Sequence, residues 1–267
     1  MNNIQRLNAR TGLRLNQDSD GAGDRWPGAG SSAEAGNANR AAEKAAGGPA
    51  RPRELATKES MLLYAVTDRS WLKGRDLADQ VEEVLRAGAT FLQIREKELD
   101  DASFLAEALR LKEIAARYGV PFVVNDNIGV ALAADADGVH VGQSDIVNQD
   151  PRALIGPDKI LGISANTVET ALAAQEAGAD YIGVGAVFGT TTKKDALSLS
   201  VERLKEICDA VSIPVVAIGG ISASNISRLA GSGVDGAAVI SAIFAQPDAG
   251  EATRRLLALA RKTFMER

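Results

Sequence analysis

Two basic residues, Arg95 and Lys97, follow a short apolar run at residues 91–94. A charged side chain is costly to bury without a counter-charge, so each of these residues needs either water or an anion. If residues 91–94 form a strand, both cations lie at its carboxyl end, where a phosphate-bearing substrate could meet them. The alternative is an ion pair with Glu96 or Glu98 in a solvated loop, which would contribute little.

Composition limits the classes of protein to consider. The chain has 267 residues, of which 45% are hydrophobic and 24% are charged, as is typical of soluble globular proteins. A net charge of −5 and an aromatic content of 4% argue against a nucleic-acid partner. The sequence contains no run of about 18 apolar residues, so we expect no transmembrane helix. We expect a cytoplasmic protein with neither a nucleic-acid nor a membrane partner.

The single cysteine, Cys208, excludes an internal disulfide. At helical spacing it shares a face with Leu204, Ile207 and Val211. A free cysteine in such a position is typically a small core residue, so we predict a packed thiol and not a nucleophile.

Residues 1–58 differ in composition from the remainder of the chain. They are rich in Gly, Ala, Ser, Asn and Arg, and no apolar periodicity is sustained. Burial cannot offset the entropy of ordering such a segment, so we predict a disordered, low-complexity extension. The folded domain is then residues 59–267. The extension could be a targeting segment, a dispensable tail or the product of a start upstream of Met61.

The rest of the chain alternates between strand and helix patterns. We expect strands at residues 62–67, 90–94, 122–124, 138–141, 159–163, 181–184, 214–218 and 236–240. We expect helices at residues 76–87, 101–118, 167–177, 200–211, 222–230 and 251–263. The strands are apolar along their length, which is typical of parallel strands buried on both faces. Eight such units predict an α/β protein with a (β/α)8 barrel.

Polar residues and glycines lie at or after the carboxyl ends of the expected strands, where barrel enzymes place their active sites. These residues are Thr67, Asp68, Gln93, Arg95, Lys97, Asn125, Asp126, Gln143, Asp145, Ser164, Thr190, Thr191, Thr192, Lys193, Gly219, Gly220 and Ser241. The backbone of Gly219 and Gly220 could bind a phosphate after strand seven, and Ser241 could do so after strand eight. A tight turn is the alternative for the glycines.

Asp126 and Asp145 follow adjacent strands and could share one Mg²⁺. Magnesium is commonly held by one or two carboxylates together with phosphate oxygens and water. The alternative is that each aspartate caps the next helix. The nearby cations Arg95, Lys97 and Lys193 favour a magnesium–pyrophosphate site.

Two other features have both a structural and a functional interpretation. His140, the only histidine, lies within an apolar run, which favours a packed, hydrogen-bonded role over that of a general base. Residues 190–193 could form a mobile loop over the site or a solvated turn.

Six motifs together resemble the thiamine-phosphate synthase family, over residues 63 to about 244. They are LYAVTD (63–68), QIREK (93–97), ND (125–126), ADGVHVGQSD (136–145), GVGAVFGTTTK (183–193) and AIGGI (217–221). The resemblance implies that hydroxymethylpyrimidine pyrophosphate loses pyrophosphate. The nitrogen of hydroxyethylthiazole phosphate then attacks the exposed methylene, which gives thiamine phosphate.

The resemblance also implies roles for individual residues. The pyrimidine pyrophosphate would be held by Gln93, Arg95, Lys97, Asn125, Ser164 and Lys193, with Ile94 and Glu96 in the same motif. The thiazole phosphate would be held by Thr190, Thr192, Gly220, Ile240 and Ser241, and Thr191, between the two threonines, would also bind substrate. Asp126 and Asp145 would bind Mg²⁺. The catalytic set would be Arg95, Lys97, Ser164 and Lys193.

Two departures from the family pattern are Ala186 and Gly189, where the family often has proline. One alternative function is a thiazole tautomerase-like isomerase, which would not need the pyrophosphate and magnesium site. A second is a non-catalytic barrel that binds a phosphorylated ligand. The phosphorylated substrates are the expected partners, and a homo-oligomer is possible.

Overall fold

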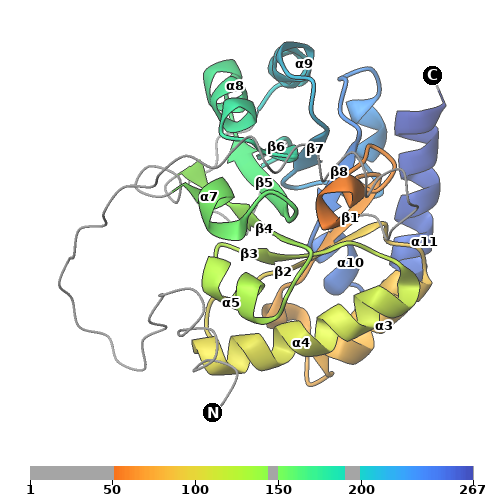
Figure 1. Cartoon of the computed structure of the whole chain (residues 1–267). Helices are drawn as coiled ribbons and strands as arrows, with labels where there is room; N and C mark the ends of the chain where they lie inside the picture. Colours follow the sequence, from red (N-terminus) through yellow and green to blue (C-terminus); the bar gives the residue numbers. More distant parts are fainter. Residues whose placement is uncertain (1–50, 144–149, 190–198, 267) are drawn as a thin grey trace, which may run out of the picture. The chain divides into compact units, whose positions relative to one another are not determined.

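The computed structural model describes residues 51–143, 150–189 and 199–266. Eight strands form a closed barrel in the order of the sequence, and every neighbouring pair is parallel (Figure 1). The strands are β1 (Leu63–Val66), β2 (Phe91–Ile94), β3 (Phe122–Asn125), β4 (Gly138–Val141), β5 (Ile160–Ala165), β6 (Tyr181–Gly185), β7 (Val215–Ile218) and β8 (Gly236–Val239). The predicted (β/α)8 barrel is therefore confirmed.

Helices surround the strands (Figure 1). The α-helices are α3 (Leu77–Arg86), α4 (Asp101–Tyr118), α5 (Ile128–Ala133), α7 (Pro151–Ile155), α8 (Val168–Glu176), α9 (Val201–Ala210), α10 (Ser241–Phe244) and α11 (Ala249–Ala260). Shorter turns are η1 (Pro52–Leu55), η2 (Arg69–Trp71) and η3 (Ile226–Leu229), and a π-helical segment, η4 (Arg261–Met265), follows α11. Within the described part of the chain, no helix is long and apolar enough to cross a membrane.

The helix ends follow from the sequence. In α4, the Asp100 side chain accepts a hydrogen bond from the Ser103 backbone N–H, which satisfies one donor at the start of the helix. Gly119 ends α4 with φ 64°, a left-handed conformation that glycine adopts without penalty. These signals placed α4 at the observed residues.

Among the expected helices, the one at residues 222–230 is wrong. Only the short turn η3 forms there. Asn225 accepts a hydrogen bond from the Ser222 backbone N–H and donates one to the Gly220 carbonyl oxygen, each at 2.8 Å. Such local side-chain bonds compete with helical backbone bonds, so the segment stays a loop.

Residues 52–58 were predicted to belong to the disordered extension, but they contact the barrel. The Arg53 backbone N–H donates to the Asp158 carbonyl oxygen at 2.8 Å, and the Arg53 side chain pairs with Asp180. Leu55 and Ala56 pack against the core cluster of the barrel. The compact unit accordingly begins at Pro52. Residues 1–50 lie outside the described residues.

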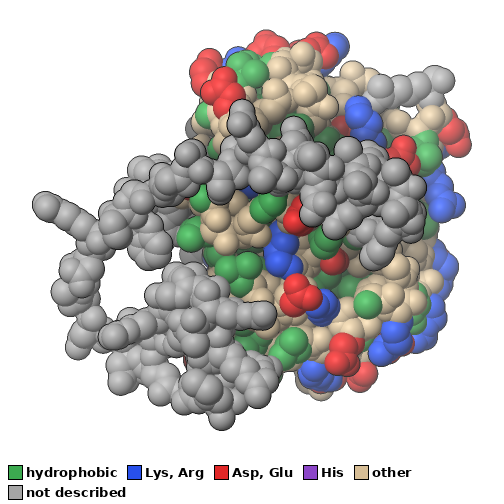
Figure 2. Space-filling model, in the orientation of Figure 1, with side chains coloured by type: hydrophobic (Ala, Val, Ile, Leu, Met, Phe, Trp, Pro, Cys, Tyr) green, Lys and Arg blue, Asp and Glu red, His purple; other side chains and the backbone are tan. Residues whose placement is uncertain are grey.

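Figure 2 shows acidic and basic side chains interspersed over the visible part of the described surface. Several of them form ion pairs between helices. Arg110 of α4 pairs with Asp76 at 3.0 Å, and Arg117 of α4 pairs with Glu82 of α3 at 3.1 Å. Pairs this exposed each contribute little stability. The fold therefore depends mainly on the apolar packing between the helices and the barrel.

Candidate active site

A cavity of about 780 Å³ lies at the carboxyl ends of the strands. Its lining includes residues that end or follow seven of the eight strands. From the predicted site these are Gln93, Arg95, Lys97, Asn125, Ser164, Gly220, Ile240 and Ser241. The structure therefore brings together, in one cavity, residues that are widely separated in the sequence.

The predicted residues Asp145, Thr190, Thr191, Thr192 and Lys193 lie outside the described residues. The roles of these five residues stay predictions.

The side chains of the QIREK motif (93–97) alternate between two sides of β2 and of the segment after it. Gln93, Arg95 and Lys97 line the cavity, whereas Ile94 and Glu96 do not. Successive side chains of an extended segment point to opposite sides, which accounts for the spacing of two. Ile94 is fully buried, so its contacts lie in the packed layer outside the barrel lumen.

Glu96 has a partner of its own on the outer side. Its carboxylate accepts hydrogen bonds from the Arg69 Nε at 3.1 and 3.2 Å, and its side chain is only 2% exposed. Arg69 also pairs with Glu107 of α4 at 3.2 Å. This pairing joins the loops after β1 and β2, so Glu96 supports the site from behind.

Arg95 is held at the mouth of the cavity. Its backbone N–H donates to the Thr67 Oγ1 at 3.0 Å, and its guanidinium lies 3.8 Å from the Asp68 carboxylate. The side chain is 12% exposed, so most of its surface is already out of water. A guanidinium in this setting is well suited to bind a phosphate in two-pronged fashion.

Three neighbouring polar side chains are joined by consecutive hydrogen bonds. The Gln93 amide nitrogen donates to the Asn125 Oδ1 at 2.8 Å, and the Asn125 amide nitrogen donates to the Asp126 carboxylate. The bond from Gln93 leaves its Oε1 as an acceptor at the cavity wall. Asp126 itself is exposed and has φ 62°, a conformation that aspartate tolerates better than most residues.

Asp126 does not cap the next helix, which was the alternative for this residue. Asn127 is the N-cap of α5, and its side chain accepts a hydrogen bond from the Val130 backbone N–H at 2.9 Å. The Asp126 backbone N–H instead donates to the His140 carbonyl oxygen of β4 at 2.8 Å. Its carboxylate is therefore placed by the β3–β4 pairing and is not used for capping.

His140 is hydrogen-bonded on both ring nitrogens. Nδ1 lies 2.9 Å from the Tyr181 hydroxyl, and Nε2 lies 3.0 Å from the Ser164 Oγ. The predicted packed, hydrogen-bonded histidine is confirmed, and the same ring also lines the cavity.

The backbone of the loop after β7 lines another part of the cavity. Gly219 and Gly220 have φ 100° and 66°. A Cβ on Gly220 would collide with the Gly189 carbonyl oxygen, so only glycine fits there. Phe188, which also lines the cavity, lies with its ring centroid 4.9 Å from the Arg228 guanidinium.

Comparison with known proteins decides the family. Residues 63–243 match the family model described as thiamine monophosphate synthase. The thiamine-phosphate synthase of Clostridium tetani is 50% identical over 194 residues, which cover 73% of this chain and 93% of that protein. The chain belongs to the thiamine-phosphate synthase family. It is accordingly a transferase of thiamine biosynthesis.

Other members support the assignment. The thiamine-phosphate synthase of Clostridioides difficile is 50% identical over 191 residues, covering 72% of this chain and 91% of that protein. The solved structure of thiamine phosphate pyrophosphorylase from Pyrococcus furiosus is 37% identical with a TM-score of 0.71. The matched region covers 77% of this chain and 98% of the Pyrococcus furiosus chain. The similarity therefore extends over nearly the whole barrel.

The cavity of this thiamine-phosphate synthase family member is also lined by residues that the sequence did not point to. They are Tyr64, Tyr181, Asn166 and Phe188. The two tyrosines lie within otherwise apolar strands and looked like core residues. Burial raises the pKa of both phenols well above the ordinary value, so both stay protonated at neutral pH. A hydroxyl-bearing ring in an apolar barrel strand was the only available signal.

The donor chemistry of the described residues fits a magnesium ion that is shared with a substrate. Asp126 supplies a hard carboxylate beside the cavity residue Asn125. Across the described ranges, no three His, Cys, Asp or Glu side chains cluster as a complete metal site would require. Magnesium seldom needs a full protein cage, because phosphate oxygens and water usually complete its shell.

Proposed function

We propose that the chain joins hydroxymethylpyrimidine pyrophosphate to hydroxyethylthiazole phosphate within this cavity, releasing pyrophosphate and thiamine phosphate. The supporting observation is that Arg95 and Lys97 line the same cavity as Gly220 and Ser241. The first pair suits the pyrophosphate, and the second pair suits the phosphate of the thiazole. Family membership supplies the identity of both substrates.

The chain's own residues account for the main requirements of this reaction. Arg95 and Lys97 neutralise the charge that builds on the departing pyrophosphate, which is where catalysis needs the most help. Gln93 presents its Oε1 to the amino group of the pyrimidine, since its amide nitrogen is engaged by Asn125. An electron-rich pyrimidine can support positive charge at the methylene, so no strong base is needed for the bond to break.

We propose that Asp126, together with Asp145, holds Mg²⁺ against the pyrophosphate. Bound magnesium would polarise the leaving group as a Lewis acid. A cytoplasmic location and a homo-oligomeric state stay predictions from the sequence.

A product assay tests the proposed function. The protein is incubated with both substrates, with and without Mg²⁺, and thiamine phosphate is measured. We expect product that depends on both substrates and on magnesium. Absence of product under all conditions would favour the non-catalytic phosphate-binding barrel. Isomerisation of the thiazole phosphate without use of the pyrimidine would favour the tautomerase-like alternative.

Adjacent residues provide a matched test of the metal assignment. Asp126→Asn removes a charge but keeps a residue that tolerates positive φ, so we expect lost activity and a raised magnesium requirement with little change in stability. Asn127→Ala removes the cap of α5, so we expect about 1 kcal/mol of lost stability and an unchanged magnesium requirement. Urea unfolding and magnesium titration of turnover distinguish the two. The same magnesium dependence in Asp126→Asn as in wild type would refute the assignment.

Lys193 can be tested although it lies outside the described residues. We expect Lys193→Ala to lower turnover while leaving the melting temperature unchanged, because its charge would be used against the leaving pyrophosphate. Unchanged turnover at saturating substrates would remove Lys193 from the catalytic set and favour a surface turn at residues 190–193.

A further inference from the structure

A line of hydrogen bonds runs from the interior of the barrel to the cavity wall. The Tyr64 and Tyr181 hydroxyls lie 2.7 Å apart, and the Tyr181 hydroxyl lies 2.9 Å from the His140 Nδ1. The His140 Nε2 lies 3.0 Å from the Ser164 Oγ. The four side chains come from β1, β6, β4 and β5, so the line crosses the barrel and does not follow one strand.

Glycines on β5 and β6 make room for this line. Gly162 is the register partner of both His140 and Tyr181, and so it lies between them on the sheet. A Cβ on Gly162 would collide with the Tyr181 ring and hydroxyl and with the His140 Nδ1. Gly183, the register partner of Ser164, would place a Cβ 3.1 Å from the His140 Cε1. Larger residues at these positions would separate the hydrogen-bonding partners.

Burial at the inner end sets the direction of the bonds. Tyr64 is 2% exposed, and within the described residues its hydroxyl bonds only with Tyr181. If Tyr181 donated to Tyr64, the Tyr64 hydrogen would have no acceptor among the described residues, and at 2% exposure the side chain has little access to water in the cavity, so this direction is costly. Tyr64 therefore donates to Tyr181, and Tyr181 donates to the His140 Nδ1. The remaining ring hydrogen of neutral His140 then lies on Nε2 and is donated to Ser164.

We propose that Tyr64 and Tyr181 are positioning residues that hold His140 in its Nε2–H form, so that Ser164 directs its hydroxyl hydrogen into the cavity. The Ser164 oxygen is occupied as an acceptor by His140, and its hydrogen is left to donate. A donor suits either acceptor on the first substrate, a ring nitrogen of the pyrimidine or a pyrophosphate oxygen. This proposal rests on the proposed function only for the identity of that substrate.

The single histidine allows a direct test on the intact enzyme. The protein is labelled with ¹⁵N-histidine, and the chemical shifts of the two ring nitrogens distinguish the tautomers and the charged ring. We expect the wild-type enzyme to show the Nε2–H form at neutral pH. In Tyr181→Phe, which loses only the hydroxyl, we expect a mixture of forms. The Nδ1–H form or a charged ring in the wild type would overturn the proposal, whatever the activity of the enzyme.

Kinetics then test the consequence for the reaction. We expect Tyr181→Phe to lower kcat roughly ten- to a hundredfold, the range seen when a group that orients a ligand-contacting side chain is removed, with KM nearly unchanged. Tyr64→Phe should have the same effect in weaker form. Tyr118→Phe is the matched control, because its hydroxyl donates to Glu82 at 3.2 Å on the outside of the barrel.

The outcomes separate this proposal from the proposed function. No thiamine phosphate from the wild type, with the expected tautomer present, would refute the function and keep the positioning role. Wild-type kcat in Tyr181→Phe, with its tautomer changed, would show that His140 does not direct Ser164 in catalysis. Equal losses in Tyr181→Phe and the Tyr118→Phe control would show a general effect on folding and overturn the proposal.

Discussion

At the scale of single residues, position within the extended segments decides which side chains reach the substrate. Gln93, Arg95 and Lys97 face the cavity, while Glu96 faces Arg69 on the other side. The same alternation places the two tyrosines of β1 and β6 in the barrel interior, where their hydroxyls meet. A side chain's chemistry therefore matters for catalysis only where the parity of its position directs it inward.

Cys208 provides a residue-scale prediction. Burial raises the pKa of its thiol to about 12, with Asp235 and Asp209 adding to the effect. The thiolate is the reactive form, so we expect alkylation at pH 8 to be at least about tenfold slower than for an ordinary thiol. Iodoacetamide labelling followed by mass spectrometry measures the rate. The urea-unfolded chain is the control and should label at the ordinary rate.

The raised pKa of Cys208 also has a consequence for stability. Between the ordinary value of 9.0 and about 12, the unfolded chain loses the thiol proton while the folded chain keeps it. The unfolded state is favoured as pH rises through this window, so Cys208 should make folding less stable there. Rapid labelling of the native protein at pH 8 would show that the thiol is not packed as the sequence predicted.

The site was predictable from sequence where polar residues interrupt an apolar pattern. Gln93, Asn125 and Ser164 lie at or near the carboxyl ends of apolar strands, and all three line the cavity. Tyr64 and Tyr181 were missed because their partners come from strands that are distant in the sequence. Local periodicity gives parity, but it does not give the identity of the residue across the barrel.

At the scale of elements, one interaction recurs on the face opposite the cavity. A residue just before each even-numbered strand accepts a hydrogen bond from the backbone N–H at the start of the preceding strand. These bonds are Leu63 to Thr90, Phe122 to Asp137 and Leu161 to Asp180, each at 2.8 Å, and Val215 to Asp235 at 3.0 Å. They satisfy strand-end donors and fix the register that aligns the catalytic ends.

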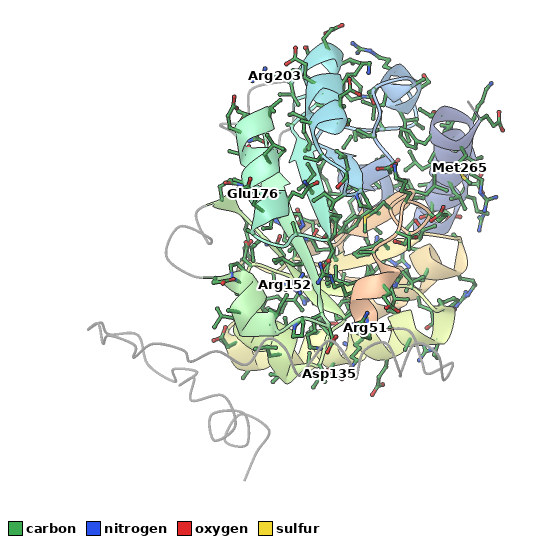
Figure 3. The ribbon with its side chains drawn as sticks, turned by 45° about the horizontal axis from the view of Figure 1, so that its top comes forward. Arg51, Asp135, Arg152, Glu176, Arg203 and Met265 are labelled. Carbon is green, nitrogen blue, oxygen red and sulfur yellow. The ribbon has the colours of Figure 1, made fainter. Side chains whose placement is uncertain are left out.

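The Gly-Ala-Asp type turns that precede several strands belong to this system. Asp180 also accepts a hydrogen bond from Arg152 of α7, a residue labelled in Figure 3. Arg152 in turn donates to the Gly156 and Lys159 carbonyl oxygens at 2.8 and 2.7 Å. One aspartate thus joins a strand to the loops around it, so we expect these turns to contribute stability and not chemistry.

Asp235 allows this expectation to be tested with a matched pair. Asp235→Ala leaves the Val215 N–H without its acceptor, so we expect a loss of about 1–3 kcal/mol in the free energy of unfolding. Asp235→Asn keeps an acceptor and loses only the ion pair with the exposed Lys58, so it should cost less than about 1 kcal/mol. Urea unfolding measures both. We expect kcat and KM to stay at wild-type values, and a selective loss of kcat would contradict a purely structural role.

At the scale of the whole molecule, the segment just before β1 packs against the core cluster inside the barrel. The core cluster contains Tyr64, Phe91 and Tyr181, and the Tyr64 and Phe91 rings lie 4.5 Å apart. Leu55 and Ala56 pack against this cluster from the segment before β1. Residues 55 and 56 thus complete the core that contains the two tyrosines of the cavity.

The overall fold was predictable because eight apolar segments at regular spacing have few other solutions than a barrel. The starting point of the domain was not predictable in the same way. Residues 52–58 contain too few apolar side chains to show a period, and their contacts with Asp158, Asp180 and Asp235 join positions more than a hundred residues apart. Long-range pairing of this kind leaves no local pattern.

Two truncations test where the domain begins. From composition, we propose that residues 1–50 are dispensable, so removing them should leave melting temperature and activity unchanged. Starting the chain at Met61 also removes the Arg53 and Lys58 ion pairs and the packing of Leu55 and Ala56. We expect this second truncation to lose at least about 1 kcal/mol of stability, which corresponds to a fall of about 2–4 °C in Tm for a domain of this size.

A full-length variant separates lost contacts from the loss of chain length. Leu55→Ala combined with Arg53→Ala should reproduce most of the fall in Tm, because it removes the apolar contact and the pairing with Asp180 while every residue before Met61 remains. Calorimetry on the three variants and the wild type measures the effect. If the chain that starts at Met61 has the same Tm as the wild type, residues 52–60 do not stabilise the barrel. The domain then begins where the sequence first indicated. If removal of residues 1–50 alone lowers Tm, the extension is part of the folded protein and its predicted disorder is wrong.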